Sequence, residues 1–325
     1  MNGCDDATWK KLVQCFERTL VGVAIEDSLR PLGEDEGQPP FICGAFSPDG
    51  SMIALSGGGR IPSHPAIWVA RVPTFETVAA LHGHQGVHDL AWDPKTGLLA
   101  SASNDYCVVC WDVPRGDHLF VYGGDEEPIV KGSVAFGDGV LYIGESEPFL
   151  DLAARLLRVD LATGDVETVF ELERDGGKRL AIDFVAVDPA TDAWAFTAND
   201  FDYFDRPMLV RGRGLTAAKV EGLERHARAL VLHRGEALVA FDREADEGKG
   251  AFAFAPDGAR IEALGGEVRT PAWTTKLDTG KDFSLVTCSP DGTRLAVAGF
   301  DVLALLDGRT GEVLARATPP AWFRP

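Results

Sequence analysis

Long apolar runs and a basic leader are both missing from the sequence. No stretch reaches about 18 apolar residues, the length that a membrane-spanning helix needs. The chain begins Met1-Asn-Gly-Cys-Asp-Asp6 and lacks the basic segment, followed by an apolar run, that marks a secretory leader. We therefore expect a soluble, cytoplasmic protein that makes no use of a membrane.

Positive charge is scarce. There are 31 Lys and Arg residues against 50 Asp and Glu, for a formal net charge of −19. Proteins that bind nucleic acid or anionic lipid neutralise phosphates with Lys and Arg, so neither is an expected partner. The simplest interpretation of the negative charge is that it keeps the protein soluble. A more specific one is that the protein prefers basic or cationic partners.

Regularly spaced cysteines are also absent. The six are Cys4, Cys15, Cys43, Cys107, Cys110 and Cys288. We expect them to be reduced and mostly buried. Cys107 and Cys110 look like a CxxC pair, but along a strand the two side chains point to opposite faces. That placement excludes a shared metal ion or a local disulfide.

Catalytic signatures are missing as well. The sequence has no Gly-rich phosphate loop, nucleophile elbow or HExxH helix. No nucleophile and base stand at a recognisable spacing. His82, His84 and His88 form an HxHxxxH string, but their rings would have to converge from a loop and a strand end to bind zinc. The sequence favours a non-catalytic protein without a cofactor.

What the sequence does contain is an internal repeat. The phrase Phe41-Ile-Cys-Gly-Ala-Phe-Ser-Pro-Asp-Gly50 returns as Phe283-Ser-Leu-Val-Thr-Cys-Ser-Pro-Asp-Gly292, and weaker copies occur between them. Each copy is a short apolar segment that ends in a Pro/Asp/Gly turn and is followed by a second apolar segment. This alternation predicts hairpins of short strands.

The repeats divide the chain into units of four short strands. The units span about 41–81, 87–122, 130–172, 180–223, 227–264 and 283–317. A unit of roughly 40–50 residues has the length of a propeller blade. Because a lone four-stranded sheet leaves both faces exposed, radial stacking is the arrangement that covers them. We predict an all-β propeller over 41–325 with six countable blades.

The second unit resembles a complete WD40 repeat. It contains Leu81-His-Gly-His-Gln-Gly86 and Leu98-Leu-Ala-Ser-Ala-Ser-Asn-Asp-Tyr-Cys-Val-Val-Cys-Trp-Asp112, with a Gly-His pair and a terminal Trp-Asp. In that family a His, a Ser, an Asp and a Trp form a hydrogen-bonded structural tetrad inside the blade. The resemblance implies a tetrad of His84, Ser101 or Ser103, Asp105 and Trp111. The Ala/Gly-rich repeats resemble those of bacterial members, which implies a bacterial source.

Residues 1–40 form a separate N-terminal segment that ends in the acidic, Pro/Gly-rich connector 33–40. Its apolar residues fit a helix that Asp5 or Asp6 would cap, and they also fit two strands at 12–16 and 20–25. The WD40 resemblance favours strands, because such propellers commonly close the ring with an N-terminal strand. The segment would then add to the last blade or form an incomplete seventh.

The same resemblance implies two unlike faces. Connections between strands two and three, and from blade to blade, lie on one face, and the remaining turns lie on the other. The first group is long, as in 57–65, 145–152, 199–207, 242–249, 123–128 and 265–282, whereas the second is short. Function concentrates on loops that folding does not require. We therefore expect the long-loop face to bind a protein or peptide partner.

The connection at 199–207 alternates aromatic and acidic residues. Exposed rings anchor a partner and carboxylates steer a basic or cationic group. Trp273, within the 265–282 junction, is a second candidate anchor. The predicted partner-binding residues are Asp200, Phe201, Asp202, Tyr203, Phe204, Asp205 and Trp273. The structural alternative is that the rings pack onto the rim of the propeller.

A calcium-type hydrolase or lactonase is the alternative function. Carboxylates from several loops would meet at the channel mouth, and oxygen ligands suit calcium. The candidate metal ligands are Glu145, Glu147, Asp202 and Asp205. These loops contain no spaced Asp/Asn/Gly ligand string, so a solvated acidic rim is favoured and a binding scaffold is the main prediction.

Overall fold

The computed structural model describes most of the chain beyond the N-terminal segment. The described residues are 41–57, 66–82, 84, 86–103, 105, 107–123, 132–146, 154–172, 180–200, 207–241, 250–279, 283–299, 302–318 and 320.

All regular structure in these residues is β, and it forms seven antiparallel sheets. The first three sheets are β1 (Cys43–Phe46), β2 (Met52–Ser56), β3 (Ile67–Arg71) and β4 (Thr77–Leu81); β5 (Val87–Trp92), β6 (Leu99–Ser103), β7 (Cys107–Asp112) and β8 (Asp117–Gly123); and β9 (Ser133–Phe136), β10 (Val140–Glu145), β11 (Ala154–Asp160) and β12 (Val166–Leu172).

The remaining sheets include the one that has only two strands. They are β13 (Leu180–Asp188), β14 (Ala193–Asp200), β15 (Met208–Arg213) and β16 (Thr216–Gly222); β17 (Ala227–His233) and β18 (Glu236–Phe241); β19 (Ala251–Phe254), β20 (Arg260–Leu264), β21 (Glu267–Arg269) and β22 (Thr274–Lys276); and β23 (Phe283–Cys288), β24 (Arg294–Gly299), β25 (Leu303–Asp307) and β26 (Val313–Ala317).

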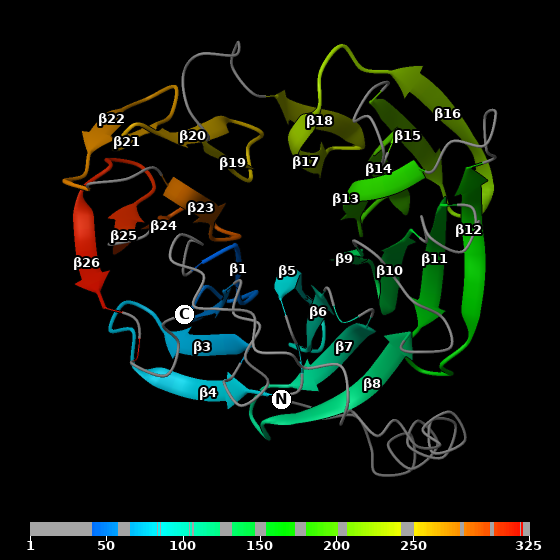
Figure 1. Cartoon of the computed structure of the whole chain (residues 1–325), viewed down its shortest axis with the longest axis horizontal. Helices are drawn as coiled ribbons and strands as arrows, with labels where there is room; N and C mark the ends of the chain where they lie inside the picture. Colours follow the sequence, from blue (N-terminus) through cyan, green and yellow to red (C-terminus); the bar gives the residue numbers. More distant parts are fainter. Residues whose placement is uncertain are drawn as a thin grey trace, which may run out of the picture.

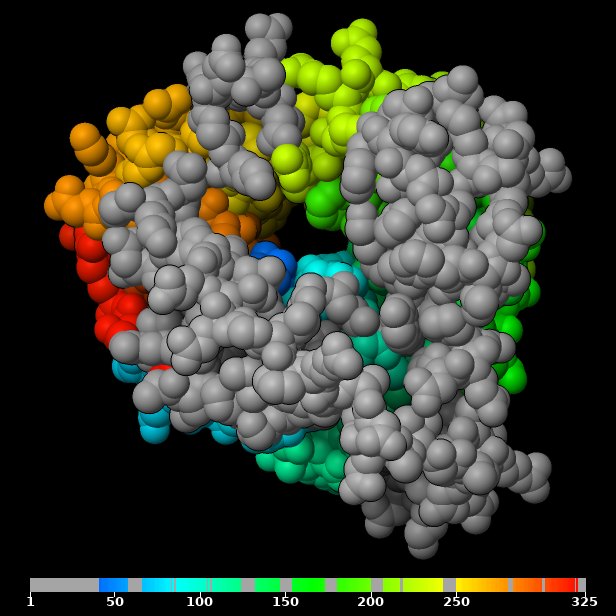
Figure 2. Space-filling model, in the orientation of Figure 1, coloured from blue at the N-terminus to red at the C-terminus, as the bar shows by residue number. Residues whose placement is uncertain are grey.

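The sheets stand around a central axis in chain order (Figure 1), and Figure 2 shows an opening at the centre of one face. The inner strands contact one another in sequence, and β23 returns to contact β1. Across this closure the Arg294 guanidinium donates a hydrogen bond to the Gly50 carbonyl, with 2.7 Å between Nη1 and O. The described strands therefore form a closed ring, and the predicted all-β propeller is confirmed.

The core lies between neighbouring sheets. Because strand residues alternate in direction, a buried strand contributes to the core on both of its sides. On β2, for example, Ile53 and Leu55 pack with the last sheet, whereas Ala54 packs with the second. Each of the five clusters of buried side chains in the described residues joins two adjacent sheets. Radial stacking is thus what makes these short sheets stable.

The repeated Pro/Asp/Gly phrase forms the tight turns that the sequence predicts. Gly50 and Gly292 adopt φ values of 67° and 70°, a left-handed conformation that glycine reaches without steric cost. Asp49 and Asp291 each bind a backbone N–H two residues further on, that of Ser51 at 3.0 Å and that of Thr293 at 3.0 Å. Side chain and backbone together define the turn.

The predicted unit at 227–264 is wrong, because the structure divides it between two sheets. Residues 227–241 form the two-stranded sheet, and β19 begins the following sheet at Ala251. A further copy of the repeat, Phe252-Ala-Phe-Ala-Pro-Asp-Gly258, marks this start and is visible in the sequence. The seventh sheet is thus formed by residues within 227–264. Residues 1–40, which the sequence assigns to the last blade or to an incomplete seventh, are outside the described part of the chain.

The sequence contains no apolar run long enough to predict a membrane-spanning helix. In the part of the chain that the structure describes, no helix is long and apolar enough to cross a bilayer.

Candidate functional site

The two rims of the propeller differ in the length of their connections. On one, called here the short-turn rim, no connection exceeds six residues, as at 93–98 between β5 and β6. On the other, the long-loop rim, the connections reach ten residues, at 57–66 between β2 and β3. The predicted asymmetry of lengths is therefore present. Most residues of the longest connections lie outside the described part of the chain.

Aspartates of the short-turn rim are occupied by their own turns. Their carboxylates accept hydrogen bonds from backbone N–H groups two or three residues ahead, as at Asp49, Asp93, Asp160, Asp188, Asp257, Asp291 and Asp307. These bonds favour the ionised form. They hold the pKa of Asp307 below its ordinary value, and the pKa of Asp49 is lowered first by the Ser47 hydroxyl and then by the Ser51 N–H. Many carboxylates of this rim thus stabilise their own turns and are not arranged to bind a ligand.

Asp291 gives an acid-sensitive prediction. Hydrogen bonds, first from the Ser289 hydroxyl and then from the Thr293 N–H, lower the pKa of Asp291 to about 2. A carboxyl with a lowered folded-state pKa stabilises the protein above its unfolded pKa, about 3.9, and loses this effect as the pH falls toward 2. We expect Asp291→Ala to lower the melting temperature at pH 7 and at pH 5, and by less at pH 3. Thermal scans at the three pH values measure this.

The exposed Glu312, on the same rim, supplies the matched control, Glu312→Ala. Its melting-temperature difference from the wild type should be small at every pH. A loss for Asp291→Ala that stays constant down to pH 3 would show that the carboxylate hydrogen bonds are not its source.

β-Bulges recur near the long-loop end of the inner strands. The pairing with the second strand skips one residue in β5, β13, β17 and β23. The skipped residues are His88, Asp183, Arg228 and Ser284. None of the four is fully buried. Bulges redirect side chains and are common next to functional sites. Four inner strands therefore place an imidazole, a carboxylate, a guanidinium and a hydroxyl around one mouth of the ring.

The bulge in β13 lies beside the start of the β14–β15 connection. The Asn199 side-chain amide donates a hydrogen bond to the Asp183 carboxylate, and Asn199 is buried. β14 ends one residue later, at Asp200, where the connection to β15 begins. A fixed polar pair thus stands at the base of the connection that the sequence selects as the binding loop.

Hydrogen bonds of the half-buried Asp89 and the buried Ser133 join neighbouring sheets. Asp89 on β5 accepts a hydrogen bond from Ser133 Oγ at 2.6 Å and from the Val134 N–H at 2.9 Å, both on β9. Ser133 Oγ in turn accepts one from the Val185 N–H on β13 at 2.9 Å. Burial raises the pKa of Asp89. One carboxylate and one hydroxyl therefore connect the inner strands of three successive sheets.

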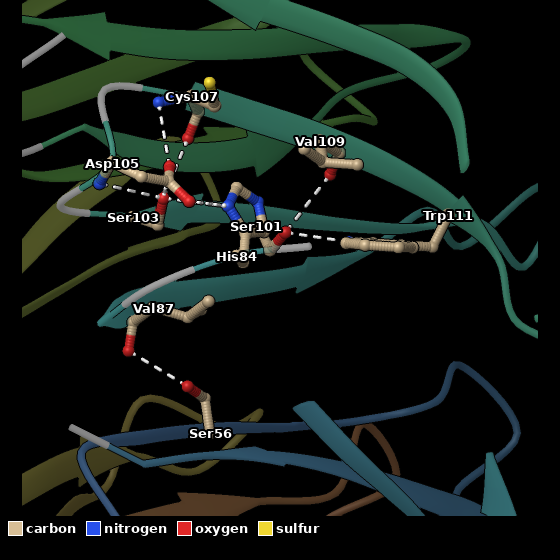
Figure 3. Close-up of polar contacts among 9 residues, drawn as sticks. All are labelled: Ser56, His84, Val87, Ser101, Ser103, Asp105, Cys107, Val109 and Trp111. Atoms are coloured by element: carbon tan, nitrogen blue, oxygen red, sulfur yellow. Dashed lines mark hydrogen bonds and ion pairs between the residues drawn. The ribbon is translucent and has the colours of Figure 1, made fainter. Parts of the chain in front are cut away.

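The predicted tetrad residues of the second sheet lie together in two hydrogen-bonded groups, which the contact between the His84 and Trp111 rings joins (Figure 3). His84 Nδ1 lies 2.8 Å from Asp105 Oδ2 and 2.9 Å from Ser103 Oγ. The Trp111 indole N–H donates to Ser101 Oγ at 2.8 Å. The sequence left Ser101 and Ser103 as alternatives, and the structure uses both, one beside Trp111 and the other beside His84.

The group around His84 ties the β4–β5 junction to the β6–β7 hairpin. His84 precedes β5, Asp105 lies between β6 and β7, and the Asp105 carboxylate also accepts the Cys107 N–H at 3.2 Å. His84 is buried, and its ring meets that of Trp111 edge-on, with 5.8 Å between centroids. The hydrogen bonds of His84 with Ser103 and Asp105, and the contact of its ring with Trp111, thus hold this part of the long-loop rim together.

The proposed metal ligands do not assemble among the described residues. Glu145 is buried, and its Oε2 accepts a hydrogen bond from Arg155 Nε at 2.6 Å, while Tyr122 Oη donates to Oε1 at 3.3 Å. Its carboxylate is thus neutralised by a guanidinium. Glu147, Asp202 and Asp205 lie outside the described residues. In the described part of the chain, no three His, Cys, Asp or Glu side chains are placed to hold a metal ion.

Most of the predicted binding residues also lie outside the described part of the chain. Phe201, Asp202, Tyr203, Phe204 and Asp205 belong to this group, and Asp200 is described only as the last residue of β14. Their role in binding stays a prediction.

The prediction that Trp273 lies in a long junction is wrong. Residues 265–282 contain β21 and β22, and Trp273 ends the short turn between them. Its indole N–H donates to the Gly308 carbonyl of the next sheet at 3.1 Å. This interaction places Trp273 on the short-turn rim, packed against the last sheet. The sequence concealed the two strands because each has only three residues.

A cleft of about 460 Å³ opens beside Trp273, between the last two sheets on the short-turn rim. Its lining includes Asp257, Asp291, Cys288 and Arg309. The two aspartates are engaged in the turns described above. Burial raises the pKa of the Cys288 thiol to about 12, so the thiol is not activated as a nucleophile.

Of the four cysteines that the structure describes, Cys110 is buried and the other three are half-buried, so the predicted burial is only partly met. Cys110 belongs to the core between the second and third sheets, whereas Cys107 packs against the core between the first and second. The two side chains therefore point to opposite faces. Cys43, Cys107, Cys110 and Cys288 form no disulfide.

Comparison with known proteins agrees with this geometry. The family model described as WD40, "WD domain, G-beta repeat", matches residues 75–112, the segment that contains His84 and Trp111. No curated protein sequence shows a significant match. The solved "Structure of Dos1 propeller" has a TM-score of 0.57 at 15% identity, covering 88% of this chain and 86% of that one. A chain of Kuenenia stuttgartiensis hydrazine synthase has a TM-score of 0.48 at 13% identity, covering 86% and 80%, which is too low to support an argument.

The fold and its neighbours define the class of protein, an all-β propeller. The family-model match and the hydrogen bonds of its residues identify one WD40 repeat within this propeller, at residues 75–112.

Proposed function

We propose that the protein is a non-catalytic scaffold that binds a protein or peptide partner through its long-loop rim. The main support is the set of four inner-strand bulges at that rim, with His88, Asp183, Arg228 and Ser284. Bulges re-aim side chains at the cost of ladder hydrogen bonds, and their recurrence at one mouth of the ring is not needed for a flat sheet.

The chemistry of the four residues fits a polypeptide. They include both signs of charge, a hydroxyl and an imidazole, which together donate to and accept from backbone amides and charged side chains. A phosphate-binding surface would be basic, and a calcium site would gather carboxylates. The sequence 201–205, between β14 and β15, contains aromatic and acidic residues of the kinds that anchor and steer a basic group. A peptide with a basic residue is the partner class that this combination favours.

The rim assignment predicts which variants lose binding. A randomised peptide library displayed on beads is the probe, and selected peptides are synthesised for titration by fluorescence anisotropy. We expect Phe201→Ala/Tyr203→Ala/Phe204→Ala and, separately, Arg228→Glu to weaken binding at least about tenfold, because hot-spot truncations cost 2 kcal/mol or more. Melting temperatures of both variants should stay close to that of the wild type.

The matched control is Asp257→Ala/Arg309→Ala, at the cleft of the short-turn rim. It should bind as the wild type does. The assignment is wrong if this control loses binding while the long-loop variants keep it. Unfolding of the triple variant would mean that its rings are structural, and Arg228→Glu then decides the question alone.

A further inference from the structure

In the part of the chain that the structure describes, the sheet of β17 and β18 has only the two inner strands. Every other sheet in the described residues has four strands, whereas β18 pairs there with β17 alone. Figure 1 shows these two strands near the centre of the ring, between the sheets of β13–β16 and β19–β22. The outer edge of β18 therefore offers a row of backbone N–H and C=O groups for strand pairing.

Packing around this sheet is incomplete as well. The second strands β6 and β10 are fully buried and β20 has two buried residues, but β18 has one, Ala240, and the apolar Leu238 and Val239 are only half-buried. None of the five core clusters in the described residues includes a residue of β17 or β18. The apolar surface of this sheet thus lacks the cover that the others have.

The neighbouring sheet shows the same deficit. Among the large apolar side chains that the structure describes, the two most exposed are Leu215 and Val220, at 54% and 52%. Both belong to the outer hairpin of β15 and β16, beside the sheet that has no outer strands. Exposed apolar groups on this sheet and half-buried ones on β18 favour an apolar segment as the cover of this region.

The chain that follows β18 is too short to fill it. Residues 265–282 contain the outer pair β21 and β22 of the next sheet, which is the shortest outer half in the molecule as described. Residues 242–250, between β18 and β19, are half as many. Two strands and their turns do not fit in this length.

We propose that residues 12–25 of the N-terminal segment form the missing outer pair and dock on the free edge of β18. The sequence Leu12-Val-Gln-Cys-Phe16 and the run Leu20-Val-Gly-Val-Ala-Ile25 fit two strands joined by a three-residue turn at 17–19. Third strands of the complete sheets are mostly buried, as in β3 and β25, whereas fourth strands are largely exposed. The fully apolar 20–25 therefore pairs with β18, and 12–16 forms the outer edge.

Two observations direct the segment to this edge and not to the last sheet. The last sheet already has four strands of its own, and β23 closes the ring against β1 without help. Residues 26–40 span at most about 50 Å when extended. A compact chain of this length has a radius of gyration of roughly 20 Å, so the connector reaches from β1 to any sheet of the ring.

Hydrogen exchange followed by mass spectrometry on the full-length chain tests the docking. The N–H groups of β18 that face away from β17 should be protected in the wild type, because a docked strand accepts their hydrogen bonds. Val21→Pro/Val23→Pro removes two N–H donors and strains the added strand. We expect residues 236–241 to exchange at least tenfold faster in this variant, and β24 to exchange unchanged.

The matched control is Ser28→Pro/Glu34→Pro, in the connector, which should exchange as the wild type does. Rapid exchange of 236–241 in the wild type itself would overturn the proposal, and so would protection that persists in Val21→Pro/Val23→Pro. Protection that rises with protein concentration would assign the edge to a second copy of the chain. A helix over residues 12–25, seen as protected amides there with an unprotected β18, would overturn it as well.

Discussion

Replacing Asp89 by alanine is expected to destabilise the propeller by at least about 3 kcal/mol, because each buried donor left without a partner costs about 1–3 kcal/mol. The Asp89 carboxylate accepts hydrogen bonds from Ser133 Oγ, from the Val134 N–H and from the Leu90 N–H. Alanine removes all three acceptor contacts. Ser133 also loses the partner that orients its hydroxyl for the Val185 N–H, so damage spreads to β13. Denaturant unfolding followed by tryptophan fluorescence measures the loss.

Asp89→Asn separates the hydrogen bonds from the charge. Burial raises the pKa of Asp89, so the wild type loses stability as the pH rises from the unfolded pKa, about 3.9, through the raised folded pKa. Asparagine has no such dependence. The difference in free energy of unfolding between the wild type and Asp89→Asn should therefore favour the wild type most near pH 4 and become smaller as the pH rises. A difference that is the same at pH 4 and pH 8 would contradict a buried, ionisable Asp89.

Trp111→Ala is expected to have the second large effect. The side chain is 3% exposed, donates to Ser101 Oγ at 2.8 Å and meets the His84 ring edge-on. Truncating a buried Trp to Ala costs about 3–5 kcal/mol. Total stabilities of domains are about 5–15 kcal/mol, so this variant is expected to unfold readily on heating. Calorimetry and denaturant titration measure the change.

Trp111→Phe is the matched control, because it keeps most of the ring and removes only the N–H donor. It should cost about 1 kcal/mol, the net worth of a typical hydrogen bond. A double-mutant cycle with Ser101→Ala should give a coupling of at least about 0.5 kcal/mol. Additive effects of Trp111→Phe and Ser101→Ala would show that the Trp111–Ser101 bond contributes nothing to stability.

The same two sites show how far sequence reasoning reaches. The tetrad is visible in the sequence because its residues stand at fixed positions in one repeat, and the structure adds only that both serines take part. Asp89 left a weaker signal, an acid within the apolar strand Val87–Trp92. Its partners lie 44 and 45 residues away on another sheet, and local sequence does not give such a pairing.

Nothing in the sequence predicts the bulges of the inner strands. His88, Asp183, Arg228 and Ser284 differ in charge and size, and nothing in the repeat marks them as equivalent. A bulge depends on the register between two strands, which packing of both faces selects. Trp273 shows the converse error. The sequence predicts a junction there because β21 and β22 have three residues each, too few to show an alternating pattern.

The sequence by itself determined the strand-and-turn repeat, the all-β class, the one full WD40 repeat and the rim on which long connections lie. These properties are local, because a Pro/Asp/Gly turn and an apolar alternation act over a few residues. Only the tertiary structure decided the number of sheets, the incomplete sheet of β17 and β18, the bulged mouth and the Asp89 network. Those depend on which sheet faces which across the ring, and that is set by closure and packing of the whole chain.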